Sequence, residues 1–248
     1  MSNAGKTLFI SDLHLDAELP ATTRGFQHFI AKAQGCDALY ILGDFFEVWV
    51  GDDDRNVLTD TIAQALATLA ASGSKIYLMH GNRDFLLGRE YAERCGAQLM
   101  QEGTVVDCYG QKAVLLHGDS LCTRDVDYMK FRKMVRAERW QNDFLERSLV
   151  ERHMIAQQTR QQSREKSSMK ASDIMDVTPQ QVLELLQEKQ VNIMIHGHTH
   201  RPAVHTIRLP EPINDRSDAV RIVLGSWDTQ GWALEFTAEA YALKHFPL

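Results

Sequence analysis

The sequence predicts an α/β fold in which two sheets form a central sandwich with helices outside. The first observation is a set of short apolar or β-branched runs that are typical of buried strands. These runs cover residues 7–11, 38–42, 75–80, 113–117 and 191–196. The second observation is that amphipathic stretches with helical spacing lie between several of the runs. The third is that residues able to bind metals end the runs, where open α/β sheets usually bind ligands.

Local patterns add detail to this outline. One predicted helix ends at Gly73 and has an apolar stripe made of Val57, Ile62, Leu66 and Leu69. Tyr109-Gly110-Gln111 separates two β-prone runs and indicates a hairpin turn. Further strands are predicted at residues 204–207, 220–224 and 232–236.

A helical insertion at about residues 124–172 is predicted to interrupt the core of a single domain, residues 1–248. Its apolar residues recur at three- and four-residue steps, at Phe131, Met134, Val135, Trp140, Phe144, Leu145 and Leu149. From the residues alone, a helical hairpin packed on the body explains this pattern. Residues 124–170 contain 12 lysines or arginines and 7 aspartates or glutamates, whereas the whole chain has a net charge of −6. A basic insertion on an acidic body indicates an anionic partner.

The composition is that of a soluble globular protein, with 44% hydrophobic and 24% charged residues. No apolar stretch approaches the roughly 18 residues of a membrane-spanning helix, and residues 1–6 lack the apolar core of a signal peptide. The cysteines are scattered without Cys-x-x-Cys spacing, at Cys36, Cys95, Cys108 and Cys122. We therefore expect reduced, buried cysteines and a cytoplasmic protein.

Five short motifs at predicted strand ends contain the residue types of a metal site. They are Asp12-x-His14, Gly43-Asp44, Gly81-Asn82-Arg83-Asp84, His117-Gly118-Asp119 and His196-Gly197-His198-Thr199-His200. Imidazoles suit Mn, Fe, Co, Ni or Zn, whereas carboxylates suit harder cations. A mixture of both with an amide oxygen favours a two-metal hydrolytic centre. The motifs contain no cysteine, which argues against a structural zinc cage.

Each motif alone also fits an ordinary turn. An isolated Asp-x-His is typical of a capped turn, Gly and Asp are common turn residues, and a histidine-rich loop can lie on a surface. The ordered set of five at strand ends is what favours the metal centre. Outside this set, we expect residues 52–54, three successive aspartates, to form a solvated loop because their charges repel, and Trp227 to serve packing.

The ordered set resembles the calcineurin-like metallophosphoesterase superfamily, whose pattern runs Asp-x-His, Gly-Asp, Gly-Asn-His-Asp or Glu, a later His, and Gly-His-x-His. Arg83 stands where most of the superfamily has histidine. This departure and longer segments resemble one branch, the UDP-2,3-diacylglucosamine diphosphatase family of lipid A biosynthesis. The segments are 10–15, 40–47, 49–54, 80–86, 117–122, 174–177 and 195–203. The resemblance extends over residues 7–248 and implies a four-layer α/β/β/α sandwich with a helical cap insertion.

The resemblance implies a site with two divalent metal ions, for which Mn²⁺ is our preferred candidate. One ion would be held by Asp12, His14, Asp44 and His198. The other would be held by Asn82, His117, His196 and the bridging carboxylate of Asp44. Two such ions activate a shared water molecule, so that no serine or cysteine nucleophile is needed. His200 would orient a phosphate or the groups around the metals.

The same resemblance implies catalytic and substrate-binding residues. Asp44, Asn82 and Arg83 would be catalytic. Substrate contacts would come from Asn82, Arg83, Asp125, Ser163, Ser167, Lys170 and His196, with Tyr128 as a neighbour. Asp125 has the best support because it follows the matching segment 117–122, whereas Ser163 and Ser167 could also be solvated residues. The insertion would shelter acyl chains and contact the membrane face. Residues 140–162 are more polar than is expected for that family, which argues against membrane attachment but not against acyl binding.

Arg83 suits the cleavage of a diphosphate. A guanidinium stays protonated and cannot act as a general acid, but it can bind phosphate oxygens and stabilise charge. A phosphate-monoester leaving group has a second pKa of about 6 and needs little proton donation. The alternative is a structural ion pair between Arg83 and Asp84 or another carboxylate.

The implied activity is attack of water at the α-phosphate of UDP-2,3-diacylglucosamine, which gives UMP and 2,3-diacylglucosamine 1-phosphate. We expect this glycolipid nucleotide and the cytoplasmic face of the inner membrane as partners, and a monomer. The alternatives are another dimetal phosphodiesterase, a nuclease, a phosphoprotein phosphatase, or a metal-binding scaffold without catalysis. The net charge of −6 and the lack of a basic stripe with interleaved aromatic residues argue against nucleic acid. The complete set of seven predicted ligands argues against an inactive scaffold.

Overall fold

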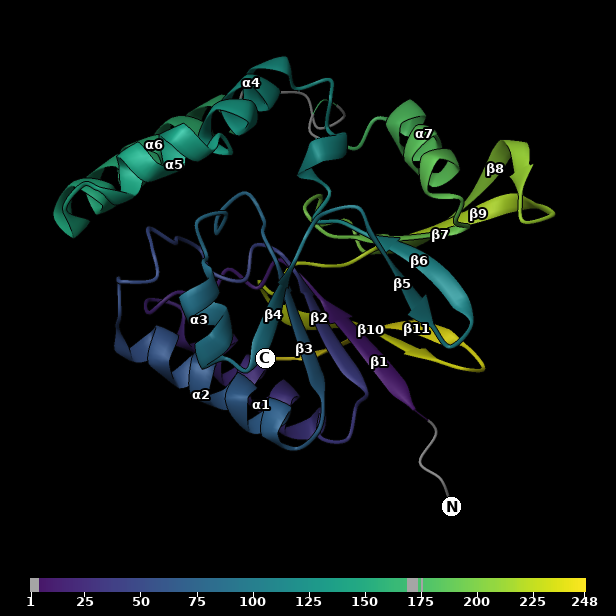
Figure 1. Ribbon diagram of the computed structural model, residues 1–248, viewed down its shortest axis with the longest axis horizontal. Helices are drawn as coiled ribbons and strands as arrows, with labels where there is room; N and C mark the ends of the chain where they lie inside the picture. The colour runs from purple at the N-terminus through teal and green to yellow at the C-terminus, as the bar shows by residue number, and fades with distance from the viewer. Residues whose placement is uncertain (1–4, 169–173, 175) are drawn as a thin grey trace.

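Two sheets face each other in the computed structural model, which describes residues 5–168, 174 and 176–248 (Figure 1). The first sheet has the strand order β11-β10-β1-β2-β3-β4, and the second has the order β5-β6-β7-β9-β8. The strands of the first sheet are β1 (Lys6–Ile10), β2 (Ala38–Leu42), β3 (Lys75–Met79), β4 (Ala97–Met100), β10 (Gln230–Thr237) and β11 (Tyr241–Pro247). Those of the second sheet are β5 (Thr104–Cys108), β6 (Gln111–Leu115), β7 (Ile193–His196), β8 (Ala203–Ile213) and β9 (Arg216–Val223).

The parallel strands bring the sequence motifs to one end of the sandwich. In the first sheet β1, β2, β3 and β4 are parallel, and in the second sheet β6, β7 and β9 are parallel. The carboxyl ends of β1, β2, β3, β6 and β7 each lead into one of the five motifs. The prediction that the motifs lie at strand ends is therefore confirmed.

Helices cover both outer faces of the sandwich (Figure 1). Helices α1 (Pro20–Lys32), α2 (Val57–Ala71) and α3 (Arg89–Arg94) lie on the first sheet, and α7 (Pro179–Lys189) lies on the second. The predicted α/β/β/α layering is thus confirmed. Between the sheets lies an apolar core whose fully buried members include Phe9, Leu42, Leu115, Ile195 and Leu234.

Helix α2 matches its predicted stripe except at its first residue. Ile62, Leu66 and Leu69 are fully buried, but Val57 is 85% exposed because it begins the helix next to the capping residue Asn56. The helix ends at Ala71, and Gly73 follows with φ of 103°. This left-handed conformation is one that glycine adopts without steric cost.

Polar edge strands account for the elements that the sequence pattern missed. The predicted hairpin turn at residues 109–110 is confirmed, since it joins β5 and β6. Strands β4 and β11 were not predicted, and each alternates or mixes exposed and partly buried residues. An edge strand needs no continuous apolar run, because one side of it faces solvent. Cys36, Cys95, Cys108 and Cys122 are free and buried, as predicted.

Three helices, and not a helical hairpin, form the described part of the insertion. They are α4 (Val126–Val135), α5 (Glu138–Leu145) and α6 (Leu149–Ser168), and they lie above the strand ends in Figure 1. Val135 and Phe144 of the predicted apolar stripe are buried, whereas Met134 is 50% exposed. Among the helices that the structure describes, none combines the length and apolarity needed to cross a bilayer.

Candidate functional site

The five motifs converge through backbone hydrogen bonds. The backbone nitrogen of Asp12 donates to the oxygen of Gly43 at 3.1 Å, and that of His14 donates to the oxygen of Asp44 at 3.0 Å. From the second sheet, the backbone nitrogen of His198 donates to the Asp12 carboxylate at 2.9 Å. These bonds join motifs that are up to 186 residues apart in the sequence.

Glycine makes this close approach possible at two positions. Gly43 has φ of 86°, and a Cβ atom added to Gly81 would lie 2.2 Å from the backbone nitrogen of Asp44. Any side chain at Gly81 would therefore push the second and third motifs apart.

Backbone strain is concentrated at the same place. Five of the nine non-glycine residues with positive φ in the described part of the chain belong to the motifs. They are Asp12, His14, Asp44, His198 and His200, with φ between 49° and 66°. Strained conformations of this kind cluster at functional sites, where the surrounding structure holds them in place.

The buried carboxylates and imidazoles fit divalent cations. Two groups bring their ligand atoms within 4.8 Å of one another: Asp12, His14 and His200, and Asp12, Asp44 and His117. Asp12, Asp44 and His117 are almost wholly buried. A buried pair of carboxylates is costly unless a cation compensates their charge. Oxygen and imidazole donors together, without thiolate, match the metal chemistry predicted from the motifs.

Two of the histidines present one ring nitrogen to this centre. Nδ1 of His14 lies 2.9 Å from Oε2 of Glu47, and Nδ1 of His117 lies 2.9 Å from the backbone oxygen of Leu42. Because both partners only accept hydrogen bonds, Nδ1 carries the proton in each ring. Nε2 is left facing the carboxylates, 3.8 Å from Asp44 in His14 and 3.6 Å from Asp44 in His117.

The remaining predicted ligands lie beside this centre. The side-chain oxygen of Asn82 lies 3.0 Å from Nε2 of His117 and 2.9 Å from Nδ1 of His198. The His196 ring is turned towards the backbone oxygen of Gly197 at 2.8 Å and towards Arg221 at 3.4 Å. His200, predicted to orient the groups around the metals, has its Nε2 3.3 Å from the Asp12 carboxylate.

Burial and charge shift the pKa values of these groups in different directions. Burial lowers the pKa of His196 to about 3, and the neighbouring Arg221 guanidinium lowers it further. Burial likewise lowers the pKa of His198 to about 4, with help from His117. For His117, burial opposes protonation, but Asp44, Asp12 and Asp119 outweigh it and raise the pKa to about 9. Burial raises the pKa of Asp44.

Arg83 extends from the third motif without an ion pair to any residue that the structure describes. Its backbone nitrogen donates to the Asp44 carboxylate at 2.8 Å, whereas its side-chain Nε is buried without a hydrogen-bond partner among the described residues. Asp84 instead binds backbone nitrogens, those of Phe45 and Gly81, at 2.7 Å each. An ion pair between Arg83 and Asp84 is therefore not found.

A pocket of about 410 Å³ begins beside the motifs and continues under the insertion. Its polar lining includes Asn82, Arg83, Asp125, Tyr128 and Ser163, together with Glu47, Asp127, Thr159, Arg160 and Gln162. Its apolar and aromatic lining comes from Val48, Trp49, Phe85, Leu86, Phe131, Met134, Trp140, Phe144, Ile155 and Ala156. We call this pocket the apolar groove.

The predicted substrate-binding residues of the insertion differ in their placement. Asp125 is the N-cap of α4 and accepts a hydrogen bond from the backbone nitrogen of Tyr128 at 3.1 Å. Ser163 lies on α6 and lines the apolar groove. Ser167 also lies in α6, but its side chain is outside the described part, and Lys170 lies outside the described residues altogether.

A polar network that the sequence did not reveal fixes α4 next to the motifs. Arg132 donates to Asp119 at 2.8 Å and to Glu102 at 2.6 Å, and the Tyr128 hydroxyl also donates to Asp119. The Tyr128 ring stacks over His198 with a centroid separation of 6.2 Å. Asp119 belongs to the fourth motif, but in the sequence Arg132 and Glu102 cannot be distinguished from surface residues, so only the tertiary structure reveals these contacts.

The loop of residues 52–54 is only partly the solvated loop that was expected, because Asp53 is exposed but all three carboxylates have partners. Asp52 accepts hydrogen bonds from the backbone nitrogens of Gly88 and Tyr91 at 2.7 and 2.8 Å. Asp53 pairs with Arg152 of α6, and Asp54 lies 2.9 Å from His153. The three carboxylates point to different partners, which relieves the repulsion on which the prediction relied. Trp227 is buried against Phe29, as predicted.

Comparison with known proteins places the chain among phosphoesterases. Residues 5–202 match the family model described as calcineurin-like phosphoesterase. A protein of Cellvibrio japonicus named UDP-2,3-diacylglucosamine hydrolase is 51% identical over 98% of this chain and 99% of its own length. Proteins with the same name from Marinobacter nauticus and Pseudomonas aeruginosa are 50% and 48% identical. They cover 98% and 97% of this chain, and 98% and 99% of their own lengths.

Proposed function

Because the chain belongs to the calcineurin-like phosphoesterase family, we propose that it is a metal-dependent hydrolase that cleaves the diphosphate of UDP-2,3-diacylglucosamine. The observation that carries this assignment is the apolar groove, which begins at Asn82 and Arg83 and continues under α4, α5 and α6. A diphosphate bound at Asn82 and Arg83 would leave the acyl chains to the apolar residues that line the groove. The names of the relatives that are about half identical support the same substrate.

Two divalent ions, with Mn²⁺ as the preferred species, would supply the chemistry of this site. Asp12, His14, Asp44 and His198 would hold one ion, and Asp44, Asn82, His117 and His196 would hold the other. Ions bound in this way lower the pKa of water and neutralise the charge of the attacked phosphate. The buried Asp12 and Asp44 carboxylates and the Nε2 atoms facing them support this assignment.

Beyond holding the ions, the protein then mainly has to orient the diphosphate of the substrate for attack by water. Water attacks the α-phosphorus, the bond to the bridging oxygen breaks, and UMP and 2,3-diacylglucosamine 1-phosphate leave. Arg83 binds phosphate oxygens, because its buried Nε has no partner among the described residues and a phosphate can supply one. The leaving monoester has a second pKa of about 6 and departs without a general acid.

The insertion is the cap that covers the acyl chains. Trp140 stacks on Phe144 with centroids 5.0 Å apart, and Ile155 and Ala156 of α6 lie on the same groove. Asp125 and Ser163, which line the groove, would contact the glucosamine phosphate together with Ser167 and Lys170.

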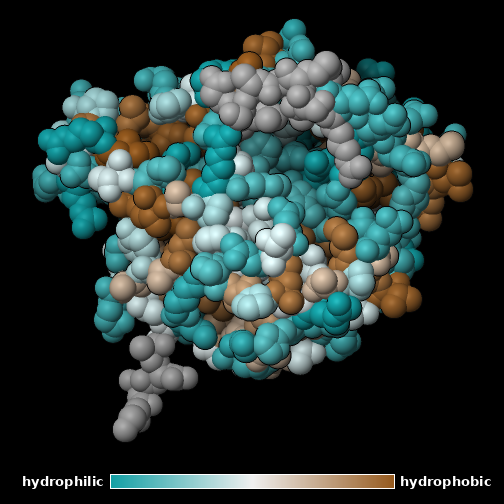
Figure 2. Space-filling view, turned by 180° about the vertical axis from the view of Figure 1, so that it is seen from behind, coloured by the Kyte–Doolittle hydropathy of each residue, from teal (hydrophilic) through white to brown (hydrophobic). Residues whose placement is uncertain are grey.

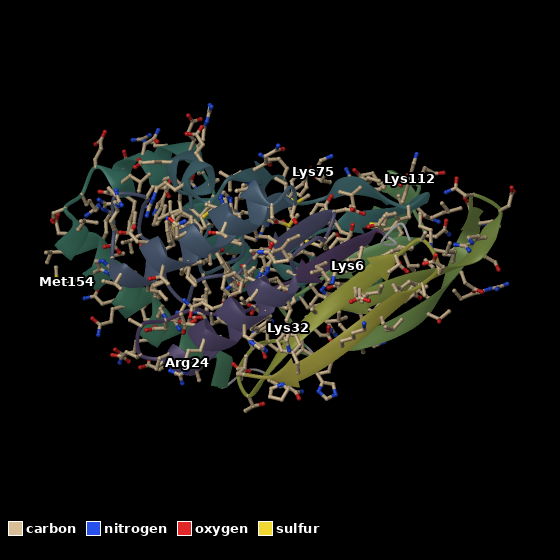
Figure 3. All side chains as sticks on the ribbon, turned by 90° about the horizontal axis from the view of Figure 1, so that it is seen from below. Lys6, Arg24, Lys32, Lys75, Lys112 and Met154 are labelled. Atoms are coloured by element: carbon tan, nitrogen blue, oxygen red, sulfur yellow. The ribbon has the colours of Figure 1, made fainter. Side chains whose placement is uncertain are left out.

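Contact with a membrane surface is part of this proposal, because the substrate is a lipid. Val150 and Met154, one turn apart on α6, are 70% and 51% exposed, and Figure 3 shows Met154 at the outer edge of the molecule. On the face drawn in Figure 2, by contrast, hydrophobic residues form separate patches among hydrophilic ones. We propose a monomer that lies in the cytoplasm and touches the inner membrane through the cap.

The experiment that tests the function is hydrolysis of UDP-2,3-diacylglucosamine in ¹⁸O-labelled water, with and without Mn²⁺, followed by mass spectrometry of both products. Metal-dependent label in UMP is expected. Label in the sugar phosphate would place the attack on the other phosphorus. No turnover of this substrate, together with turnover of simple phosphodiesters, would support the other family activities, a phosphodiesterase, nuclease or phosphoprotein phosphatase.

A further inference from the structure

Glu47 links a predicted metal ligand to the insertion. Its Oε2 lies 2.9 Å from Nδ1 of His14, and its Oε1 forms an ion pair with Arg160 of α6. Arg160 also donates a hydrogen bond to the backbone oxygen of Glu47. The three side chains are only 14–19% exposed, so that solvent screens their interactions weakly.

The contact with Glu47 determines which nitrogen of His14 faces the centre. A carboxylate accepts the proton on Nδ1, and this leaves Nε2 as the free ligand atom beside Asp12 and Asp44. A carboxylate that binds the second nitrogen of a ligating histidine fixes its tautomer and its orientation. Glu47 can hold the His14 ring in this orientation only while its own carboxylate stays in place. Arg160 of α6 fixes that carboxylate through the ion pair.

We propose that Glu47 is a positioning residue that couples the docking of α6 over the apolar groove to the metal affinity of the His14 site. The inference rests on the proposed two-metal function and deepens it. When α6 is docked, Arg160 holds Glu47 against His14 and the metal binds tightly. Linkage requires the reverse effect as well, so metal binding stabilises the docked position of α6. The cap that shelters the lipid thereby favours a loaded metal centre.

Arg152 supplies a matched comparison within the same helix. Like Arg160, it reaches from α6 to the loop after β2, where it donates to the backbone oxygen of Val50 at 2.7 Å and pairs with Asp53. Its side chain is 4% exposed, which makes it at least as well anchored as Arg160. Among the described residues, neither Val50 nor Asp53 forms a hydrogen bond or ion pair with His14 or with another predicted ligand. Arg152 therefore anchors the cap without reaching the metal centre.

The test measures Mn²⁺ affinity by titration calorimetry and by electron paramagnetic resonance of free Mn²⁺, with the full chain and no substrate. In Glu47→Gln the affinity of one site, the one that contains His14, should fall about 10–100-fold, the usual effect of removing such a partner. In Arg160→Gln, which leaves His14 and Glu47 intact, the Mn²⁺ affinity of the same site should fall about 5-fold or more. Arg152→Gln should bind Mn²⁺ as the wild type does. Arg160→Lys should recover part of the lost affinity, because the ion pair can form again.

Two further measurements separate coupling from general damage. The double variant Glu47→Gln/Arg160→Gln should bind Mn²⁺ no more weakly than Glu47→Gln alone, since the effect of Arg160 passes through Glu47. In hydrogen exchange, Mn²⁺ should slow the exchange of residues 149–163 in the wild type and in Arg152→Gln, but much less in Arg160→Gln.

Wild-type Mn²⁺ affinity in Arg160→Gln would overturn the coupling, and so would an equal loss in Arg152→Gln. Both results would leave the proposed hydrolase intact, provided that the wild type binds two ions and turns over substrate. A wild-type protein that binds no divalent ion would overturn the two-metal function and this inference together. If Glu47→Gln does not fold, Arg160→Gln and Arg152→Gln still decide the question.

Discussion

The carboxylate of Asp84 accepts a hydrogen bond from the backbone nitrogen of Phe45 at 2.7 Å. The last residue of the third motif therefore holds the backbone directly after the second motif, Gly43-Asp44. The second oxygen of Asp84 accepts a hydrogen bond from Gly81 at 2.7 Å, and the side chain is fully buried. Asp84 thereby sets the position of Asp44, which precedes Phe45 and which we propose as the bridging ligand. Asp84 needs no contact with the metals to determine their geometry.

Replacing Asp84 with asparagine should lower both stability and metal affinity. The amide can replace only one acceptor oxygen, and an unsatisfied buried donor costs about 1–3 kcal/mol. For a chain of this size we expect a fall in Tm of roughly 3–10 °C by calorimetry. Asp60→Asn is the control, because Asp60 forms exposed ion pairs with Arg55 and Arg94 that contribute little. Equal Tm values for the two variants would show that Asp84 does not hold the motifs together.

Removal and return of metal should change stability as well as activity. Mn²⁺ at about 100 times its Kd should stabilise the metal-free protein by about 2.7 kcal/mol, which corresponds to roughly 5–10 °C in Tm. Asp44→Asn should abolish most of this shift, because Asp44 would touch both ions. The measurement is differential scanning fluorimetry after chelation and dialysis. A full Mn²⁺-dependent shift in Asp44→Asn would contradict the bridging role.

Arg83→Lys should lower kcat/KM for the diphosphate substrate by about 10–100-fold. Lysine keeps the charge, but it cannot reproduce the planar fork that binds two phosphate oxygens. A lost hydrogen bond to a charged group corresponds to about 1.5–3 kcal/mol. The control is Arg89→Lys on α3, where Arg89 is 89% exposed and pairs with Glu93. Near-normal turnover in Arg83→Lys would exclude bidentate phosphate binding by Arg83.

The sequence predicted the location of the candidate site better than it predicted the surroundings of that site. The motif residues could be found because strand ends and residue types are local features, and His198 and Asp12 meet as the strand pattern requires. The pairing of Glu47 with Arg160 could not be predicted, because the two residues are 113 positions apart and each alone has the character of an ordinary charged surface residue. The exposure of Val57 and the partners of residues 52–54 depend on where a helix begins and on which loops pack together, and neither is encoded by periodicity.

Tyr109 should make stability depend on pH in the alkaline range. Burial and the hydrogen bond that its hydroxyl donates to Asp37 raise the pKa of Tyr109 to about 12. The folded state holds this proton more tightly than the unfolded state does, whose tyrosine pKa is about 10. The stabilisation is therefore complete below pH 10 and is lost as the pH rises through about 12. Chemical denaturation should show Tyr109→Phe to be less stable than the wild type at pH 8, with a smaller difference at pH 11.5. A difference that stays constant with pH would mean that the hydroxyl proton is not involved.

Filling the apolar groove should separate recognition of the acyl chains from the chemistry. Ala156 lines the groove from α6, so Ala156→Phe would occupy space that we assign to acyl chains. We expect kcat/KM for UDP-2,3-diacylglucosamine with long acyl chains to fall at least about 10-fold, since a few methylene contacts are each worth 1–3 kcal/mol. An analogue with acetyl groups, which cannot reach the groove, should be hydrolysed at an unchanged rate. Gln158→Phe is the matched control, because Gln158 lies on the same helix, is exposed and does not line the groove. If Ala156→Phe slowed both substrates equally, the groove would not be the acyl site and the change would have disturbed the catalytic centre itself.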